Sequence, residues 1–90
     1  MTTEEIKKHL IGRWSLKIPE GTVHYRFDEN RRYTRSGASS SSAEYKIVSN
    51  GDAIHIVTDD ETVEFLGFDM GDMYWRRGLV RFVLNRESLY

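Results

Sequence analysis

The chain has 90 residues, of which 30% are charged and 12% are aromatic, and its formal net charge is −1. A chain of this length buries only about 60% of its unfolded surface, so we expect a single domain over residues 1–90 with a core of large side chains. The charged content argues against a disordered or membrane-spanning chain, and the lack of cysteine excludes disulfides, thiolate metal sites and a cysteine nucleophile.

The first residues carry the signals of a short N-terminal helix. Thr2 or Thr3 can cap its start, and Thr2 with Glu5 has the spacing of a capping box. Acidic residues come first and basic residues last, as the helix dipole favours. Gly12 stops the helix, whose apolar stripe consists of Ile6, Leu10 and Ile11. Two turns of helix are not stable alone, so we expect it to dock across a barrel mouth.

From Trp14 onward the hydrophobic period is two, which is typical of half-buried strands. The strongest hairpin signal is the Asn50-Gly51 pair, because both positions of a tight hairpin turn need positive φ. The serine-rich residues 37–42 predict a mobile loop, and residues 67–71 predict a looser connection. Turn signals thus divide the chain into about eight predicted strands: 14–18, 22–27, 32–36, 45–48, 53–57, 62–66, 72–77 and 80–86.

A flat sheet of these segments would leave two open edges and one wet apolar face. The sequence therefore predicts a mainly β fold, an up-and-down antiparallel β-barrel of about eight short strands with a short N-terminal α-helix. The inward positions of the strands should share one core, formed by Trp14, Leu16, Val23, Tyr25, Phe27, Tyr45, Ile47, Ile54, Ile56, Val63, Phe65, Trp75, Phe82 and Leu84.

Gly12-Arg13-Trp14 follows the predicted helix and opens the first strand. A Gly-x-Trp at this place resembles the start of the lipocalins, and the pattern along the chain is similar to that of the small lipocalin-like, calycin-type domains of bacteria. The resemblance implies that the helix plugs one end of the barrel and that Trp14 lies on its floor. It also implies that Arg86 lies across the tryptophan, where a guanidinium can stack on the indole.

Arg35 and Arg77 share the strand parity of the predicted core. An inward arginine is costly unless it is paired or lies at the wet end of a barrel, so both are candidates for the mouth of a pocket. There they would hold a carboxylate or phosphate, and the 37–42 loop could close over them. The alternative is that each extends to solvent from a strand end. The other residues of this predicted ligand-binding site are Tyr25, Tyr33, Tyr45 and Trp75.

No residue set in the chain predicts catalysis, a metal site or a cofactor. The three histidines lack zinc-binding spacing, and His24 and His55 have outward parity in their strands. The acidic residues 59–61 and the pair Asp69 and Asp72 lack the oxygen series of a calcium site. We therefore expect a non-enzymatic binding domain without catalytic residues.

Charge is distributed unevenly along the second half of the chain. Seven acids and no Lys or Arg lie in residues 52–72, whereas four Arg and no acid lie in residues 76–86. We expect these segments to pair across the sheet, and the alternative is a polarised surface that steers a charged partner. Nucleic-acid binding ranks low, because the arginines of residues 26–35 are diluted by acids and the net charge is negative.

Two classes of partner remain. The barrel resemblance favours a small apolar or anionic amphipathic ligand. Aromatic side chains can instead fill a barrel of short strands, and an outward apolar set then favours a protein partner or homodimer: Val48, Val57, Leu66, Tyr74 and Val83. No apolar run is long enough to span a bilayer. The N-terminus lacks the apolar core of a secretory signal, which favours the cytoplasm if Met1 is the native start.

Overall fold

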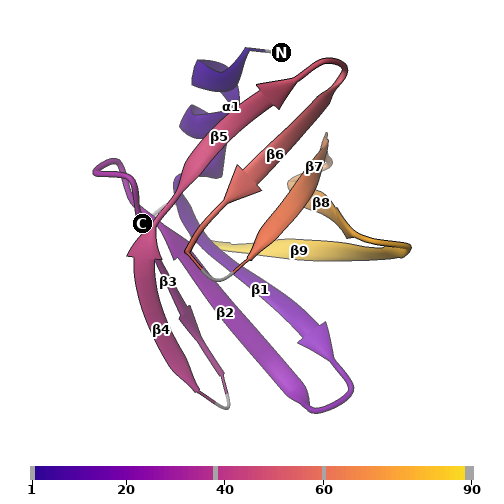
Figure 1. Cartoon of the computed structure of the whole chain (residues 1–90). Coiled ribbons are helices and arrows are strands. Elements are labelled where there is room, and N and C mark those ends of the chain that lie inside the picture. The colour runs from indigo at the N-terminus through magenta and orange to yellow at the C-terminus, as the bar shows by residue number, and fades with distance from the viewer. Residues whose placement is uncertain (1, 38, 60, 89–90) are drawn as a thin grey trace.

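The computed structural model describes residues 2–37, 39–59 and 61–88. These residues form one short helix and nine antiparallel strands in a single sheet, whose order is β4-β3-β2-β1-β9-β8-β7-β6-β5 (Figure 1). The elements are α1 (Thr3–Leu10), β1 (Gly12–Ile18), β2 (Gly21–Phe27), β3 (Arg32–Ser36), β4 (Ser40–Glu44), β5 (Lys46–Asn50), β6 (Ala53–Val57), β7 (Thr62–Asp69), β8 (Asp72–Arg77) and β9 (Val80–Ser88). The predicted up-and-down barrel with an N-terminal helix is confirmed.

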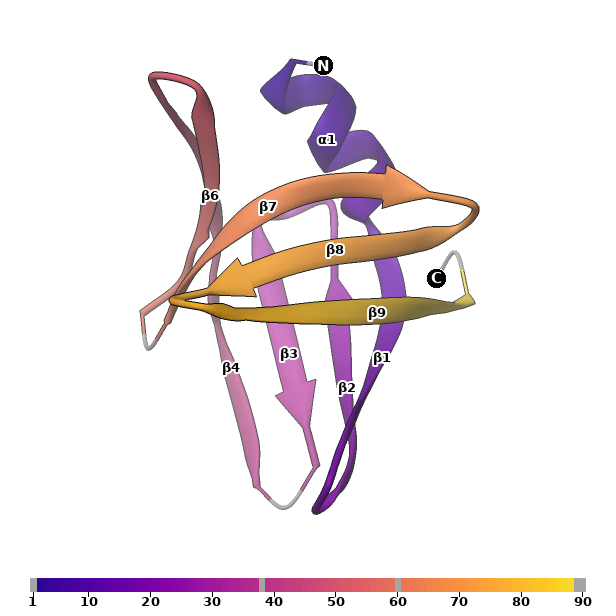
Figure 2. The ribbon, with the colours of Figure 1, turned by 90° about the vertical axis from the view of Figure 1, so that its right-hand side faces the viewer.

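The sheet curls until it is nearly closed. Pairing of β1 with β9 joins strands from the two ends of the chain, and the edge strands β4 and β5 are linked directly through Tyr45. In Figure 2, β7, β8 and β9 cross in front of β1, β2 and β3, and α1 lies over one end of the barrel. The β1–β2 hairpin and the paired strands β3 and β4 extend beyond β9 at the other end of the barrel, which we call its mouth.

The prediction of a mobile loop over residues 37–42 is wrong for its second half. Ser40 begins β4, which pairs with β3 from Ser36↔Ser40 to Arg32↔Glu44. Serine has a low strand propensity, but pairing with a neighbouring strand and burial of one face override propensity in sheets. Ala43 supplies that buried face. Ala38 lies outside the described residues.

The prediction of a loose connection over residues 67–71 is wrong for residues 67–69, which belong to β7 and follow a β-bulge. β7 continues to Asp69, and its register with β8 shifts between Phe65 and Gly67, where Gly67 has a φ of 149°. The extra residue changes the strand parity, so Phe65 and Phe68 both face inward. Their ring centroids lie 5.0 Å apart. The bulge thus adds to the core an aromatic residue that strict alternation misses.

Aromatic side chains fill the centre of the barrel. The rings of Tyr25, Tyr33, Tyr45 and Trp75 all lie within 6.3 Å of the Phe27 ring, measured between centroids. The predicted core positions all belong to this interior, including four that are partly buried: Val23, Ile47, Ile54 and Phe82. Side chains thus pack the middle of the barrel.

The helix closes one end through its capping box and its apolar stripe. The Thr2 hydroxyl accepts from the Glu5 amide, the Glu5 carboxylate accepts from the Thr2 amide, and Ile6 and Leu10 are fully buried. Gly12 begins β1 with a φ of 133°, a conformation that favours glycine and lets the strand start directly after the helix. The predicted capping box is confirmed.

Trp14 and Arg86 join the helix end to the barrel. The Trp14 indole is 1% exposed, and its Nε1 donates to the Leu10 carbonyl at 2.8 Å. The Arg86 guanidinium carbon lies 4.0 Å from the centroid of the Trp14 ring. Arg86 also donates to the carbonyls of Ile11, at 2.9 Å, and His9. Both side chains thus satisfy carbonyls that the end of an α-helix leaves unpaired.

Candidate functional site

A pocket of about 240 Å³ opens at the barrel mouth, at the end away from α1. β1 leaves the helix at Gly12, and the far half of this strand contributes to the pocket wall. One side is apolar and the other carries two arginines, so the pocket offers both kinds of contact to a small molecule. Its lining consists of Leu16, Ile18, Val23, Tyr25, Arg35, Gly37, Ser39, Trp75, Arg77 and Phe82.

Strand register positions the polar and aromatic groups of the pocket. Tyr25 on β2 is the cross-strand partner of Arg35 on β3, and Trp75 on β8 is the partner of Phe82 on β9. The guanidinium carbon of Arg77, near the end of β8, lies 5.4 Å from the centroid of the Phe82 ring. The two arginines therefore approach the mouth from opposite walls, each beside an aromatic side chain.

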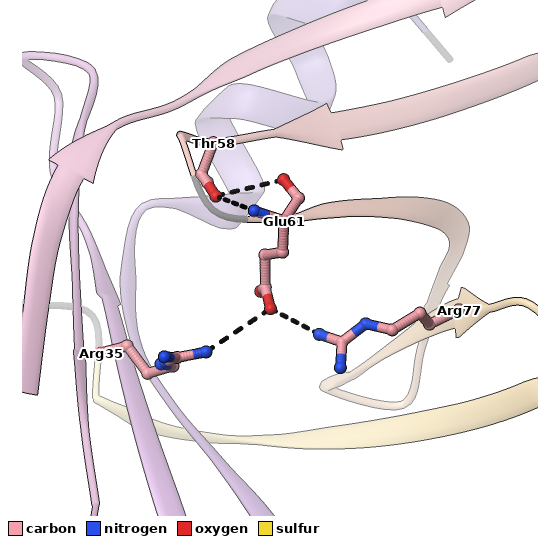
Figure 3. A network of polar contacts seen from close by, with 4 residues as sticks. All are labelled: Arg35, Thr58, Glu61 and Arg77. Carbon is pink, nitrogen blue, oxygen red and sulfur yellow. Dashed lines mark hydrogen bonds and ion pairs between the residues drawn. The ribbon is translucent and has the colours of Figure 1, made fainter. Parts of the chain in front are cut away.

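Glu61, in the β6–β7 connection, projects between these arginines (Figure 3). Its Oε2 accepts from Arg77 Nη2 at 2.5 Å and lies 3.6 Å from Arg35 Nη1. The Glu61 backbone is held to Thr58, because the Thr58 amide donates to the Glu61 carbonyl at 2.9 Å and the Glu61 amide donates to the Thr58 hydroxyl at 3.1 Å. One carboxylate thus lies between two guanidinium groups.

Burial differs among the three charged side chains. Glu61 is 11% exposed, whereas Arg35 is 31% and Arg77 is 50% exposed. The nearby Tyr25 hydroxyl senses all three: burial and the negative charge of Glu61 raise the pKa of Tyr25, and Arg35 and Arg77 oppose that rise. The mouth is therefore a partly dry site in which charge interactions are stronger than on an open surface.

The structure brings four of the predicted ligand-binding residues together and separates two. Tyr25, Arg35, Trp75 and Arg77 line the mouth pocket. Tyr33 is 1% exposed within the aromatic core. Tyr45 lies nearer the helix, where it lines a different hollow beside α1 and donates from its hydroxyl to the Asp28 carbonyl at 2.8 Å.

Glu61 is the charged residue of the candidate site that the sequence analysis missed, because it was assigned to a turn. A signal was present: Glu61 has the same parity as Val63 and Phe65, which are buried on β7. Extending the two-residue period one step beyond the strand would have placed this carboxylate inward, toward the predicted arginines.

The hollow beside α1 has a similar volume of about 250 Å³, and its charged lining consists of Glu4, Lys7, Arg31 and Lys46. These side chains are mostly exposed and of mixed sign. Exposed charges in water contribute little to binding. The mouth pocket is the stronger candidate, because its charges are partly buried and converge on one point.

The buried hydroxyl of Tyr45 predicts a loss of stability at high pH. Burial, followed by the charge of Asp28, raises the pKa of Tyr45 from 10.0 to about 12. The folded state holds this proton more tightly, so the contribution is complete below the unfolded pKa and is lost as the pH rises through 12. We expect the free energy of unfolding to fall by roughly 2 to 3 kcal/mol, at about 1.4 kcal/mol per pKa unit.

Urea unfolding at a series of pH values above 9 would measure this loss, with Tyr45→Phe as the control. The phenylalanine variant should be less stable at neutral pH, because it lacks the hydrogen bond to Asp28. Its stability should fall less steeply with pH than that of the wild type, because the proton of Tyr45 no longer contributes. Equal slopes in both proteins would contradict the assignment to Tyr45.

Acidic and basic segments pair across the sheet, as predicted. Glu64 on β7 pairs with Arg76 on β8, its cross-strand partner, and Glu61 pairs with Arg77.

The predicted outward apolar residues are exposed or half-buried. The exposed ones are Val48, Leu66 and Val83, and the half-buried ones are Val57 and Tyr74. Across residues 2–37, 39–59 and 61–88, no three histidine, aspartate or glutamate side chains are grouped so that they could hold a metal ion.

Fold and site together define a small antiparallel β-barrel, plugged by a helix at one end and hollowed at the other by a pocket with two arginines. Comparisons of the chain with protein-family models, with curated proteins and with solved structures found no significant match. Within the described part of the chain, no helix is both long and apolar enough to cross a membrane.

Proposed function

We propose that this protein is a non-enzymatic, lipocalin-like binding domain whose barrel mouth takes a small amphipathic molecule with an anionic head. The observation that carries the proposal is the convergence of Arg35 and Arg77, from opposite walls, on the Glu61 carboxylate at the edge of an apolar pocket. Charge-assisted hydrogen bonds from arginine to a carboxylate are among the strongest polar contacts in proteins.

The apolar side of the pocket suits the tail of such a molecule. Leu16 and Val23 are cross-strand partners on β1 and β2, and Ile18 and Phe82 complete this side. The volume of about 240 Å³ lies below the roughly 300 Å³ at which pockets for drug-sized ligands begin. Because aromatic rings fill the barrel below, the tail should be short rather than a long fatty chain.

The closed end supports the lipocalin-like part of the proposal. The plugging helix, the glycine at the start of β1 and the arginine stacked on the first-strand tryptophan are the features that the resemblance implies for this end. These features describe the architecture of the barrel and not its ligand. The class of ligand is therefore inferred from the mouth pocket alone.

Exposed apolar side chains favour protein binding as the second function. Met70 and Leu79, at the tips of the β7–β8 and β8–β9 hairpins, are 96% and 101% exposed. These two turns lie at opposite ends of β8, so each exposed side chain can anchor a partner or a second copy of the chain separately. Sedimentation of the wild type and of a Met70→Ser, Leu79→Ser variant would test the second-copy form of this alternative.

Titration with octanoate and with neutral octanol would test the ligand proposal. We expect octanoate to bind the wild type and change its tryptophan emission, because Trp75 lines the pocket. Arg77→Gln should weaken octanoate binding about 10- to 150-fold, the equivalent of one charged hydrogen bond at about 1.5 to 3 kcal/mol. Arg35→Gln should weaken it in the same direction.

Arg81→Gln is the matched control, because it removes one positive charge from an exposed position on β9 outside the pocket. It should leave octanoate binding unchanged. If calorimetry and fluorescence detect neither octanoate nor octanol with the wild type or with the Glu61 variant described below, the small-molecule proposal is wrong. Protein binding then becomes the better account.

A further inference from the structure

We propose that Glu61 is an internal competitor of the ligand: its carboxylate occupies the place between Arg35 and Arg77 that the head of a bound carboxylic acid takes. The inference rests on the proposed function and adds to it a regulation of the same site. It identifies the favoured head group as a carboxylate, because this is the group that the two arginines already hold.

The pairing of Glu61 differs from that of an ordinary ion pair on this barrel. Glu64, three residues further along the chain, pairs with one arginine, its cross-strand partner Arg76. Glu61 instead approaches two arginines through the same oxygen, Oε2, and is the most buried of the three side chains. Guanidinium groups that approach a carboxylate from two sides can hold an external carboxylate in the same way.

Glu61 satisfies the arginines but leaves the apolar wall available. Ile18, Val23 and Phe82 are only partly buried, although each packs against the core. A carboxylic acid with a short tail can contact the arginines and also cover this wall, which adds apolar burial that Glu61 does not supply. This difference lets an external carboxylate displace the internal one.

The exchange requires little movement of the chain. Hydrogen bonds join the Glu61 backbone to Thr58 and do not involve the Glu61 carboxylate. Rotation about the side-chain bonds of Glu61 is therefore enough to release the arginines. A competitor of this kind lowers the apparent affinity for the ligand. The apparent affinity equals the intrinsic affinity multiplied by the fraction of time for which the competitor leaves the site free.

Glu61→Gln removes the competing charge while keeping the size of the side chain. We expect octanoate to bind Glu61→Gln at least about tenfold more tightly than the wild type, the equivalent of about 1.4 kcal/mol. Octanol should bind both proteins equally. The gain should disappear in the double variant Glu61→Gln, Arg77→Gln, because the second substitution removes the arginine that Glu61 hydrogen-bonds.

Glu64→Gln is the matched control, since it removes one carboxylate three residues further along the chain, on β7, from an ordinary ion pair with one arginine. It should bind octanoate like the wild type, and thermal unfolding would verify that both variants are folded. An equal gain in Glu64→Gln would show a general charge effect and overturn the inference. The inference would also be overturned if the wild type binds octanoate and Glu61→Gln binds it equally well or more weakly. In that case the proposed function would still stand.

Discussion

Replacing Trp14 with alanine should lower the free energy of unfolding by about 3 to 5 kcal/mol. The indole is 1% exposed, stacks on Phe68 with ring centroids 6.0 Å apart, and lies beneath Arg86. The substitution leaves a cavity at the helix end and removes the donor that the Leu10 carbonyl uses. A loss of this size is a large share of the 5 to 15 kcal/mol that stabilises a typical domain.

Urea unfolding followed by circular dichroism would measure this loss, and Trp14→Phe is the companion variant. Phenylalanine keeps an aromatic ring but has no indole N–H, so it should retain part of the lost stability. The difference between the two variants separates packing from the Leu10 hydrogen bond. An unfolding midpoint of Trp14→Ala close to that of the wild type would show that Trp14 does not hold the helix to the barrel.

Arg86→Met should lower the free energy of unfolding by about 3 to 4 kcal/mol. Arg86 donates to the carbonyls of His9 and Ile11, and each charged hydrogen bond contributes about 1.5 kcal/mol at the low end of the measured range. The cation–π contact with Trp14 adds about 0.5 to 1 kcal/mol. Burial lowers the pKa of Arg86, which is consistent with a charge that is partly removed from water.

Arg81→Met is the matched control on the same strand, because Arg81 is exposed and its replacement should change stability by less than about 0.5 kcal/mol. The variant Trp14→Ala, Arg86→Met completes a double-mutant cycle. The two losses should sum to more than the loss in the double variant, since the side chains contact each other. Equal stabilities of Arg86→Met and Arg81→Met would contradict the proposed capping role.

The fold could be predicted because most strands obey a strict two-residue period. Val63 and Phe65, for example, are buried at alternate positions of β7, as their spacing requires. The prediction failed where backbone geometry or pairing overrides local sequence. Phe68 faces inward only because the bulge before it shifts the register, and Ser40 joins a strand only because β3 pairs with it.

The candidate site could be predicted in part, for a different reason. Parity tells which face of a strand a residue occupies, but the tilt and stagger of the strands decide its height along the barrel. Arg35 and Tyr33 share a face of β3, yet Arg35 lines the mouth and Tyr33 packs in the centre. Glu61 was missed because the turn residues around it hide its inward parity.

Pairing of β1 with β9 has a consequence for the order in which the molecule is built. Neighbouring hairpins can form as soon as their two strands exist, but Trp14 and Arg86 are cross-strand partners separated by most of the chain. Contacts this distant in sequence form slowly, because a long loop must close first. During synthesis, β9 is the last of these strands to leave the ribosome. Until it arrives, the helix end lacks its arginine cap, and the half-finished sheet exposes the edge of β1 to neighbouring chains.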